Sequence, residues 1–336
     1  MIRAMSVLLV VLITAAVLWP ASDTEPPQVE LSNGVLQARF YLPDAERGYY
    51  RGTRFDWSGV MPDLRYKGHE YFGQWFPKYD PKLHDAIMGP VEEFKLGEPF
   101  TAAESSWGFG EAEPGQTFVR LGVGAVRRPD SSNYEWSRTY DIVDPGKWTV
   151  RQGRDWIEFR HELSHPSGYA YVYTKRVRLV SGQPQMIIEH TLRNTGRRAI
   201  HAEQYNHNFF VIDGRPTGPD VVVRFPFELK AERELQPLAA VHGRQLVYLR
   251  ELQAGEETYS ELSGFGSGAQ DYDIRIENLA AGVGARIRGD RPLARLQFWS
   301  IRTTVCPEAF IALSVEPGRE EKWTLRYDFY ELRPSQ

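Results

Sequence analysis

The stretch Ala202–Asp213, AEQYNHNFFVID, places one histidine between two amides in a run of residues that favours a β-strand. His207 follows Asn206 and precedes Asn208, and aromatic residues lie beyond both. One interpretation is a hydrogen-bonded histidine in the core or at a sheet edge, since histidines are commonly part-buried. The other is a strand that lines a concave face, where the imidazole titrates near neutral pH and aromatic rings contact a ligand. A second stretch further along the chain favours the concave face.

That second stretch, Gln297–Phe310, reads QFWSIRTTVCPEAF and predicts an apolar strand. Glu308 comes directly after Pro307, so its carboxylate is expected to be held near a rigid turn. Further on, a Pro-Gly pair at 317–318 predicts a turn, and the alternating run that begins at Trp323 predicts a closing strand. The chain therefore carries a histidine and a glutamate on two separate predicted strands.

Together the two stretches resemble the aldose 1-epimerases and hexose-phosphate mutarotases of the galactose mutarotase-like superfamily. In that family an Asn-His strand before an aromatic pair supplies the catalytic acid, and a later Cys-x-Glu-like motif supplies the base. The resemblance implies that His207 is the acid and Glu308 the base. Glu308 would take the proton of the anomeric hydroxyl while His207 protonates the ring oxygen, and closure of the open aldehyde on its other face would invert the anomer. This chemistry requires no metal or organic cofactor.

The resemblance and the local sequence also suggest residues that bind the substrate: Arg54, His84, Asp273, Arg288 and Trp299. Mutarotases carry an early histidine beside a glycine turn, for which His84 is the nearest counterpart and His69 the competitor. They also place a substrate-binding aspartate before the catalytic glutamate, and Asp273 matches it by position.

Three of the singled-out residues have structural interpretations as well. The guanidinium of Arg54 can form paired hydrogen bonds to sugar hydroxyls or to an acid group, or a salt bridge to Asp56 or Asp63. The indole of Trp299 can stack on the apolar face of a sugar ring, or it can pack in the core. Cys306 is expected to be a buried strand residue rather than a nucleophile, because no histidine partner can be placed beside it.

The region Gly48–Phe94 mixes glycines, aromatic residues and charges, so we expect long loops across one face of the sandwich. Near its end lie Glu92 and Glu93. Neighbours in a strand point to opposite faces, so at most one of them can enter a site. That residue could form the carboxyl pair of a glycoside hydrolase with Glu308, or it could pair with Arg54 or Lys95.

The rest of the chain predicts one strand after another. Val29–Tyr41 predicts a hairpin with Asn33-Gly34 at its turn. Only Leu229–Leu238 hints at a helical period. We expect an all-β chain folded as an antiparallel β-sandwich, which the resemblance refines to a large β-supersandwich of the galactose mutarotase-like type. Further strands are expected at Phe118–Ala125, Tyr134–Val143, Thr149–Val150, Trp156–Leu163, Tyr169–Leu179 and Gln185–Leu192.

Residues 1–22, MIRAMSVLLVVLITAAVLWPAS, have the outline of a secretory signal peptide, with Arg3 before an apolar run and small residues after it. Because Trp19 or Pro20 would stand three residues before the cut, an uncleaved membrane anchor is the alternative. Residues 23–336 contain no low-complexity linker and are expected to form a single domain that is periplasmic or secreted.

The composition of the chain argues against several classes of binding partner and site. The formal net charge of -4 gives nucleic-acid binding no electrostatic basis. A single cysteine excludes an internal disulfide framework, and the sequence has no Cys/His spacing typical of metal sites. A membrane contact would come only through an uncleaved N-terminal segment.

Two functions of different class follow. One is an exported aldose 1-epimerase-like mutarotase that acts on a free reducing sugar. The other is a non-catalytic carbohydrate-binding β-sandwich module linked to polysaccharide use, and a lyase or hydrolase is a third interpretation. In each case the partner is a small-molecule sugar or an oligosaccharide.

Overall fold

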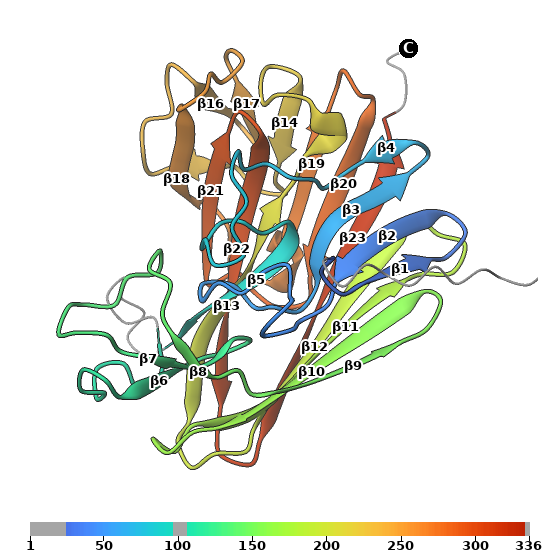
Figure 1. Cartoon of the computed structure of the whole chain (residues 1–336). Coiled ribbons are helices and arrows are strands. Elements are labelled where there is room, and N and C mark those ends of the chain that lie inside the picture. The colour runs from blue at the N-terminus through green and yellow to red at the C-terminus, as the bar shows by residue number, and fades with distance from the viewer. Residues whose placement is uncertain (1–24, 97–105, 333–336) are drawn as a thin grey trace, which may run out of the picture.

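The computed structural model describes residues 25–96 and 106–332, which fold into antiparallel β-sheets with two short 3-10 turns. The predicted signal or anchor segment, residues 1–22, lies outside the described residues. Two large sheets form most of the fold, and two small sheets accompany them (Figure 1). The prediction of an all-β chain is confirmed.

The larger sheet has ten strands in the order β16-β17-β14-β19-β20-β23-β12-β11-β10-β9. In β10, buried and less buried residues alternate, because one face packs on the core and the other faces solvent. The bounds of the ten strands are β9 Lys147–Gln152, β10 Trp156–Ser164, β11 Ala170–Leu179, β12 Gln185–Asn194, β14 Val221–Arg224, β16 Ala239–His242, β17 Gln245–Tyr248, β19 Asp273–Asn278, β20 Val283–Gly289 and β23 Glu320–Glu331.

The second sheet has six strands in the order β15-β18-β21-β22-β13-β5. The two stretches singled out in the sequence supply β13 and β22, which are direct neighbours, with Tyr205 opposite Phe310. Nearly every residue of β13 is buried, which indicates that both faces of this strand are covered. The bounds of the six strands are β5 Gly89–Leu96, β13 Ile200–Phe209, β15 Lys230–Ala231, β18 Glu257–Ser263, β21 Arg295–Ile301 and β22 Thr304–Val315.

The small sheets begin with the predicted hairpin. Asn33 Oδ1 accepts hydrogen bonds from the backbone N–H groups of Val35 and Leu36 at 2.9 and 2.7 Å, and Gly34 has a φ of 87°. These features close the turn as the Asn-Gly pair predicts. The remaining elements are β1 Gln28–Ser32, β2 Leu36–Tyr41, β3 Val60–Tyr66, β4 His69–Glu70, β6 Thr117–Arg120, β7 Gly124–Arg127, β8 Ile142–Asp144, η1 Ile212–Gly214 and η2 Ala269–Asp271.

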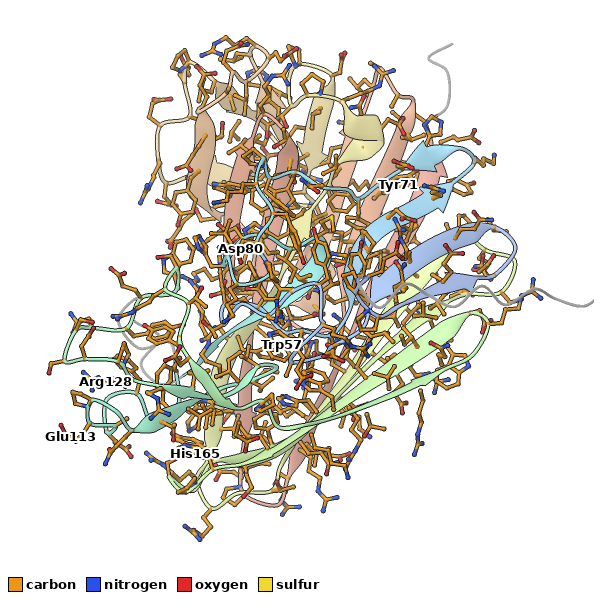
Figure 2. All side chains as sticks on the ribbon, in the orientation of Figure 1. Trp57, Tyr71, Asp80, Glu113, Arg128 and His165 are labelled. Atoms are coloured by element: carbon orange, nitrogen blue, oxygen red, sulfur yellow. The ribbon has the colours of Figure 1, made fainter. Side chains whose placement is uncertain are left out.

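The region Gly48–Phe94 differs in part from the prediction of long loops across one face of the sandwich. It contains β3, β4 and most of β5, and its aromatic residues form much of a second hydrophobic cluster beside the main core. Trp57 is 1% exposed and lies in the interior, whereas Glu113 and Arg128 lie at the periphery near β6 and β7 (Figure 2). The loops of this region are therefore held in place by buried rings.

Three other local predictions are wrong. Phe118–Ala125 is split between β6 and β7, because Gly122 and Gly124 turn the chain with φ values of 77° and 139°. Within Tyr134–Val143 only the last two residues belong to a strand. Leu229–Leu238 is not helical, and Pro237 lacks the N–H that a helix would use. No helix in the described part of the chain is long and apolar enough to cross a membrane.

Candidate functional site

One face of the six-stranded sheet lines a cavity of about 370 Å³, a size in the range of small-molecule pockets. Alternate residues of a strand share a face, so Tyr205, His207 and Phe209 of β13 point the same way. Glu308 of β22 lies opposite Gln297 of β21 in the sheet register. The side chains that line the cavity are Arg54, Trp75, Asp85, Glu93, Lys95, Trp136, Tyr205, His207, Phe209, Glu257, Tyr259, Gln297, Trp299 and Glu308.

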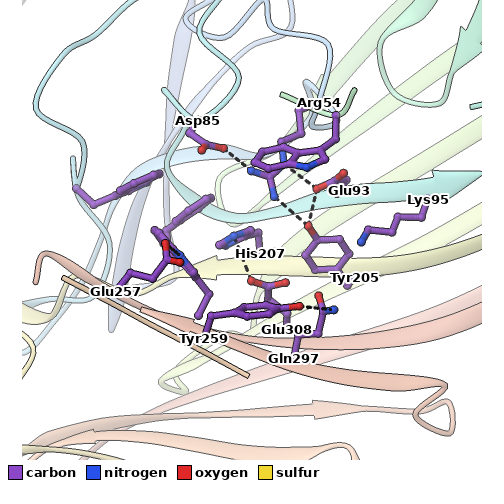
Figure 3. Close-up of a pocket in the computed structure, with 14 residues that line it drawn as sticks. Arg54, Asp85, Glu93, Lys95, Tyr205, His207, Glu257, Tyr259, Gln297 and Glu308 are labelled. Carbon is purple, nitrogen blue, oxygen red and sulfur yellow. Dashed lines mark hydrogen bonds and ion pairs between the residues drawn. The ribbon is translucent and has the colours of Figure 1, made fainter. Parts of the chain in front are cut away.

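His207 and Glu308 meet in this cavity. His207 Nε2 lies 3.2 Å from Glu308 Oε1, and the two residues are 4% and 5% exposed (Figure 3). The ring of Phe209 stacks on the imidazole at 4.0 Å, and Phe55 meets it edge-on at 5.8 Å, measured between ring centroids. His207 Nδ1 is buried and has no hydrogen-bond partner among the described residues. Aromatic packing and the contact with Glu308 therefore hold the imidazole.

Burial shifts the pKa values of both groups. Burial lowers the pKa of His207 to about 3, and the Arg54 guanidinium adds to this shift. Burial raises the pKa of Glu308 to about 7, while the cations of Arg54 and Lys95 act in the opposite direction. Near neutral pH the imidazole is therefore uncharged, and Glu308 is the group that gains or loses a proton.

Arg54 binds two of the carboxylates in the cavity. Its Nε donates to Glu93 Oε2 at 2.8 Å, and its Nη1 donates to Asp85 Oδ1 at 2.5 Å. Its Nη2 donates to the hydroxyl oxygen of Tyr205 at 3.3 Å, and that hydroxyl donates to Glu93. Although burial raises the pKa of Asp85, the Arg54 guanidinium lowers it to about 2. These contacts fix Arg54 in one orientation at the wall of the cavity.

The salt bridges expected as alternatives for Arg54 do not form. Asp63 pairs instead with Arg39 at 2.7 Å, and Asp56 accepts hydrogen bonds from Ser58. Asp63 lies on β3 opposite Arg39 of β2, and Asp56 is buried.

Arg120 holds the loop that carries Arg54. Its guanidinium is 2% exposed and donates to the carbonyl oxygens of Thr53 at 3.1 Å and Arg54 at 2.7 Å. It also donates to the carbonyl oxygen of Phe94 on β5 at 3.3 Å. The buried guanidinium therefore ties this loop to the sheet that carries the site.

Aromatic rings form much of the remaining wall. Trp75 stacks on Phe209 at 4.6 Å between ring centroids and meets Trp299 edge-on at 5.5 Å. The indole N–H of Trp299 donates to Glu257 at 3.1 Å. Trp136 is 47% exposed although it also lines the cavity. Flat apolar faces beside polar groups suit a ligand such as a sugar ring.

Four of the seven residues predicted for the site line this cavity: His207, Glu308, Arg54 and Trp299. His84 lies just behind the wall, with its Nε2 3.0 Å from Asp85 and its ring edge-on to Trp136 at 5.3 Å. The competing His69 pairs with Asp213 at 2.7 Å and does not line the cavity.

The placement of Asp273 and Arg288 in the same site is wrong. They lie opposite each other on β19 and β20, in the ten-stranded sheet. Asp273 pairs with Arg286, and Arg288 pairs with Asp328 at 2.5 Å. Both residues precede Glu308 in the sequence, but they lie on a different sheet from it.

The adjacent glutamates point to opposite sides of β5, as the strand geometry predicts. Glu93 lines the cavity and pairs with Arg54, one of the two partners that were expected. Glu92 faces the core and contacts Lys175 and His190. Cys306 is fully buried, as expected, and burial raises the pKa of its thiol.

Sequence reasoning missed several cavity residues. Tyr205, which precedes His207 by two positions, carried a usable signal, because the two must share a face if the strand is regular. Gln297 could have been found in the same way from Trp299. Asp85 and Trp136 lie outside the strands, where no period relates them to the site. Within residues 25–96 and 106–332, no group of three or more His, Cys, Asp or Glu side chains could hold a metal ion.

No family model and no curated protein sequence matches this chain. Several solved structures do resemble it. The Slr1438 protein of Synechocystis sp. PCC 6803 has a TM-score of 0.54 at 12% identity, over 94% of this chain and 100% of that protein. A galactose mutarotase-like protein of Lactobacillus casei has a TM-score of 0.51 at 11% identity, over 90% and 100%. A candidate aldose 1-epimerase of Escherichia coli K12 has a TM-score of 0.52 at 13% identity, over 91% and 100%. At these identities the likeness shows the fold, and the chain therefore has the galactose mutarotase-like fold.

Proposed function

We propose that the chain binds a reducing sugar in this cavity and interconverts its anomers by acid-base catalysis. The observation that carries the proposal is the 3.2 Å contact of His207 Nε2 with Glu308 Oε1 inside an aromatic-walled cavity. Opening a cyclic hemiacetal needs one group that accepts a proton and one that donates a proton, both close to the anomeric carbon. The pair meets this requirement with protein side chains alone.

The number of protons on the pair decides when it is active. With the pKa of His207 near 3 and that of Glu308 near 7, the pair holds one proton between these values. Burial favours the uncharged arrangement, in which the proton sits on Glu308. In that arrangement His207 accepts the proton of the anomeric hydroxyl, and Glu308 donates its proton to the ring oxygen.

Ring closure then reverses both transfers. After the bond between C1 and the ring oxygen breaks, the aldehyde rotates, and closure on the other face returns each proton. The assignment made from the sequence, with Glu308 as base and His207 as acid, describes the other distribution of the same single proton. Each residue therefore acts once as acid and once as base in a full cycle.

The apolar N-terminal stretch supports an exported protein. The free reducing sugars outside the cytoplasm would then be its substrates, and the enzyme would be periplasmic, secreted or membrane-anchored. This part of the proposal depends on the sequence of residues 1–22.

The test is anomer exchange measured by NMR on the purified protein with reducing hexoses, pentoses and uronic acids. We expect exchange faster than in buffer, and loss of the added rate in His207→Ala and Glu308→Gln. Glu277→Gln is a matched control, because Glu277 is a buried glutamate that pairs with Arg224 on the ten-stranded sheet, away from the cavity. Folded protein that exchanges no sugar would contradict the proposal.

A second function, sugar binding without catalysis, is favoured by one specific observation. His207 Nδ1 has no hydrogen-bond partner among the described residues, whereas catalytic histidines commonly have their second nitrogen held by a carbonyl or carboxylate. A carbohydrate-binding module would need the aromatic walls and Arg54 but no such orientation. Affinity for oligosaccharides without a free anomeric end, together with no exchange, would support this function.

A further inference from the structure

Almost every charged side chain of the cavity has a hydrogen bond or an ion pair, and the exception is a cation. Of the carboxylates, Asp85 and Glu93 contact Arg54, Glu257 accepts from the indole of Trp299, and Glu308 contacts His207. Lys95 also lines the cavity, but it forms no hydrogen bond or ion pair with any residue in the described ranges. Its ammonium is therefore the one charged group of the cavity that has neither a hydrogen bond nor an ion pair in that part of the chain.

Strand geometry aims Lys95 at the site. It lies two residues after Glu93 on β5, so the two side chains share the face that lines the cavity. The Nζ atom lies 5.4 Å from the centroid of the Phe310 ring, and the side chain extends toward Tyr205 (Figure 3). Because Lys95 lines the cavity, a ligand bound there can reach its ammonium.

Arg295, the cation next to Lys95, already has ion-pair partners. Arg295, on the same sheet, pairs with Glu203 at 2.9 Å and lies 3.9 Å from Glu261. Its guanidinium also packs over Phe310 at 4.0 Å. Arg295 therefore forms ion pairs with protein carboxylates, whereas Lys95 forms none with the described residues.

The Lys95 ammonium interacts electrostatically with the carboxylates of Glu93 and Glu308, but both carboxylates contact other residues, so burial costs the ammonium solvation without giving it an ion pair. A ligand that brings one negative charge would complete it, because hydrogen bonds between an ammonium and a carboxylate are among the stronger ones. A sugar that carries only hydroxyl groups would leave the Lys95 ammonium without an ion pair. The cavity thus discriminates between ligands by charge as well as by shape.

We propose that the ligand of this cavity is an acidic sugar, a uronate, whose carboxylate binds Lys95 while its anomeric end faces His207 and Glu308. The inference rests on the proposed function, since it takes a sugar as the ligand. An anionic substituent could also be a phosphate, but one unpaired ammonium matches the single charge of a carboxylate. A phosphate dianion usually recruits several cations or arginine forks.

The experiment is isothermal titration of the full chain with D-galacturonate, D-glucuronate, the matching neutral hexoses and their 6-phosphates. In the wild-type protein we expect a uronate to bind at least about tenfold more tightly than its neutral hexose at low ionic strength. Lys95→Met, which keeps the length of the side chain, should remove this preference, and Lys95→Arg should keep most of it. A rise in salt should weaken uronate binding and leave neutral-sugar binding unchanged.

The outcomes separate the two proposals. Equal affinity for uronate and neutral hexose, or a uronate preference that survives in folded Lys95→Met, would overturn the role of Lys95. A preference for the 6-phosphate would overturn the uronate and assign the anion to a phosphate. Uronate binding that depends on Lys95 without anomer exchange would keep this inference and remove catalysis. Exchange of neutral sugars with no uronate preference would keep catalysis and overturn the role of Lys95. Binding of none of these sugars to folded protein would overturn both.

Discussion

His207 Nε2 lies 3.2 Å from Glu308 Oε1 inside the cavity, and both side chains are buried. The pair occurs because β13 and β22 are adjacent in the six-stranded sheet. Because both groups are buried, the electrostatic interaction between them is stronger than it would be in water. Protonation of this pair is therefore the property that links the fold to the proposed chemistry.

The rate of anomer exchange should depend on pH through this pair. Its active form holds one proton, and the pKa of Glu308 is about 7, so kcat/KM should be flat from pH 5 to 6 and fall about tenfold per unit well above pH 7. Both distributions of the single proton predict the same profile. The measurement is exchange by NMR at constant ionic strength, with the buffer rate subtracted at each pH.

The variant Lys95→Met sharpens this test. The Lys95 cation lowers the pKa of Glu308, so its removal should move the falling limb of the profile to higher pH. A profile that rises through pH 7 would contradict the single-proton form of the pair, and a limb that stays in place in Lys95→Met would show that the two groups do not interact.

Glu308→Gln should stabilise the protein more at high pH than at low pH. The folded-state pKa of Glu308 is raised from 4.5 to about 7, so its favourable contribution is complete below pH 4.5 and is lost as pH rises through 7. At pH 8.5 ionisation of Glu308 should therefore lower the free energy of unfolding of the wild type by up to about 3 kcal/mol, and the glutamine variant should not show this loss. Asp56, whose pKa burial raises to about 7, titrates in both proteins and cancels.

Thermal unfolding of the two proteins at pH 5 and pH 8.5 measures this effect. The difference in Tm between Glu308→Gln and the wild type should be clearly larger at pH 8.5. An equal difference at both pH values would mean that Glu308 ionises as an exposed glutamate does.

Much of the fold could be predicted because it follows short-range patterns. The Asn33-Gly34 turn and the alternation of residues in β10 and β11 each carry a local signal that tertiary structure preserves. The path between Gly48 and Phe94 had no such signal. Its rings are buried by contacts with distant segments, as Trp57 shows by stacking near Trp148, and no local pattern predicts such pairs.

The site, like the fold, could be predicted from the sequence only in part. His207 and Glu308 could be paired from the sequence only through a family resemblance, which located the two strands but did not place Asp273 correctly. The orientation of Arg54 depends on two carboxylates that lie on different segments, Asp85 and Glu93. Contacts of this kind arise from the three-dimensional path of loops, which no sequence period describes.

Lys175→Met should strongly destabilise the fold. Lys175 and Glu92 are 1% and 0% exposed and form a buried ion pair, with His190 Nε2 at 3.0 Å from Glu92 and Asn206 donating to it at 2.9 Å. Removal of the lysine leaves a buried carboxylate without its main counter-ion, which costs about 3–5 kcal/mol. The measurement is urea unfolding at pH 7.

The double variant Glu92→Gln/Lys175→Met is the control for this prediction. It removes both charges, so it should recover at least half of the lost free energy of unfolding. If the two substitutions add without recovery, the destabilisation comes from packing rather than from the uncompensated charge.

Trp136→Ala should weaken sugar binding while leaving the fold intact. Trp136 lines the cavity, is 47% exposed, and has the Arg54 guanidinium 4.2 Å from its ring centroid. Because Arg54 is itself fixed by two carboxylates, the indole is held in place while much of its surface stays open to a ligand. Loss of one such aromatic contact should reduce affinity about 3- to 10-fold, measured by calorimetry with the sugar that binds most tightly.

Leu249→Ala is the matched control, since Leu249 is equally exposed at 47% but does not line the cavity. The affinity of this variant for the sugar should equal that of the wild type. Unchanged affinity in Trp136→Ala would mean that the ligand stays deeper in the cavity, against Trp75 and Trp299.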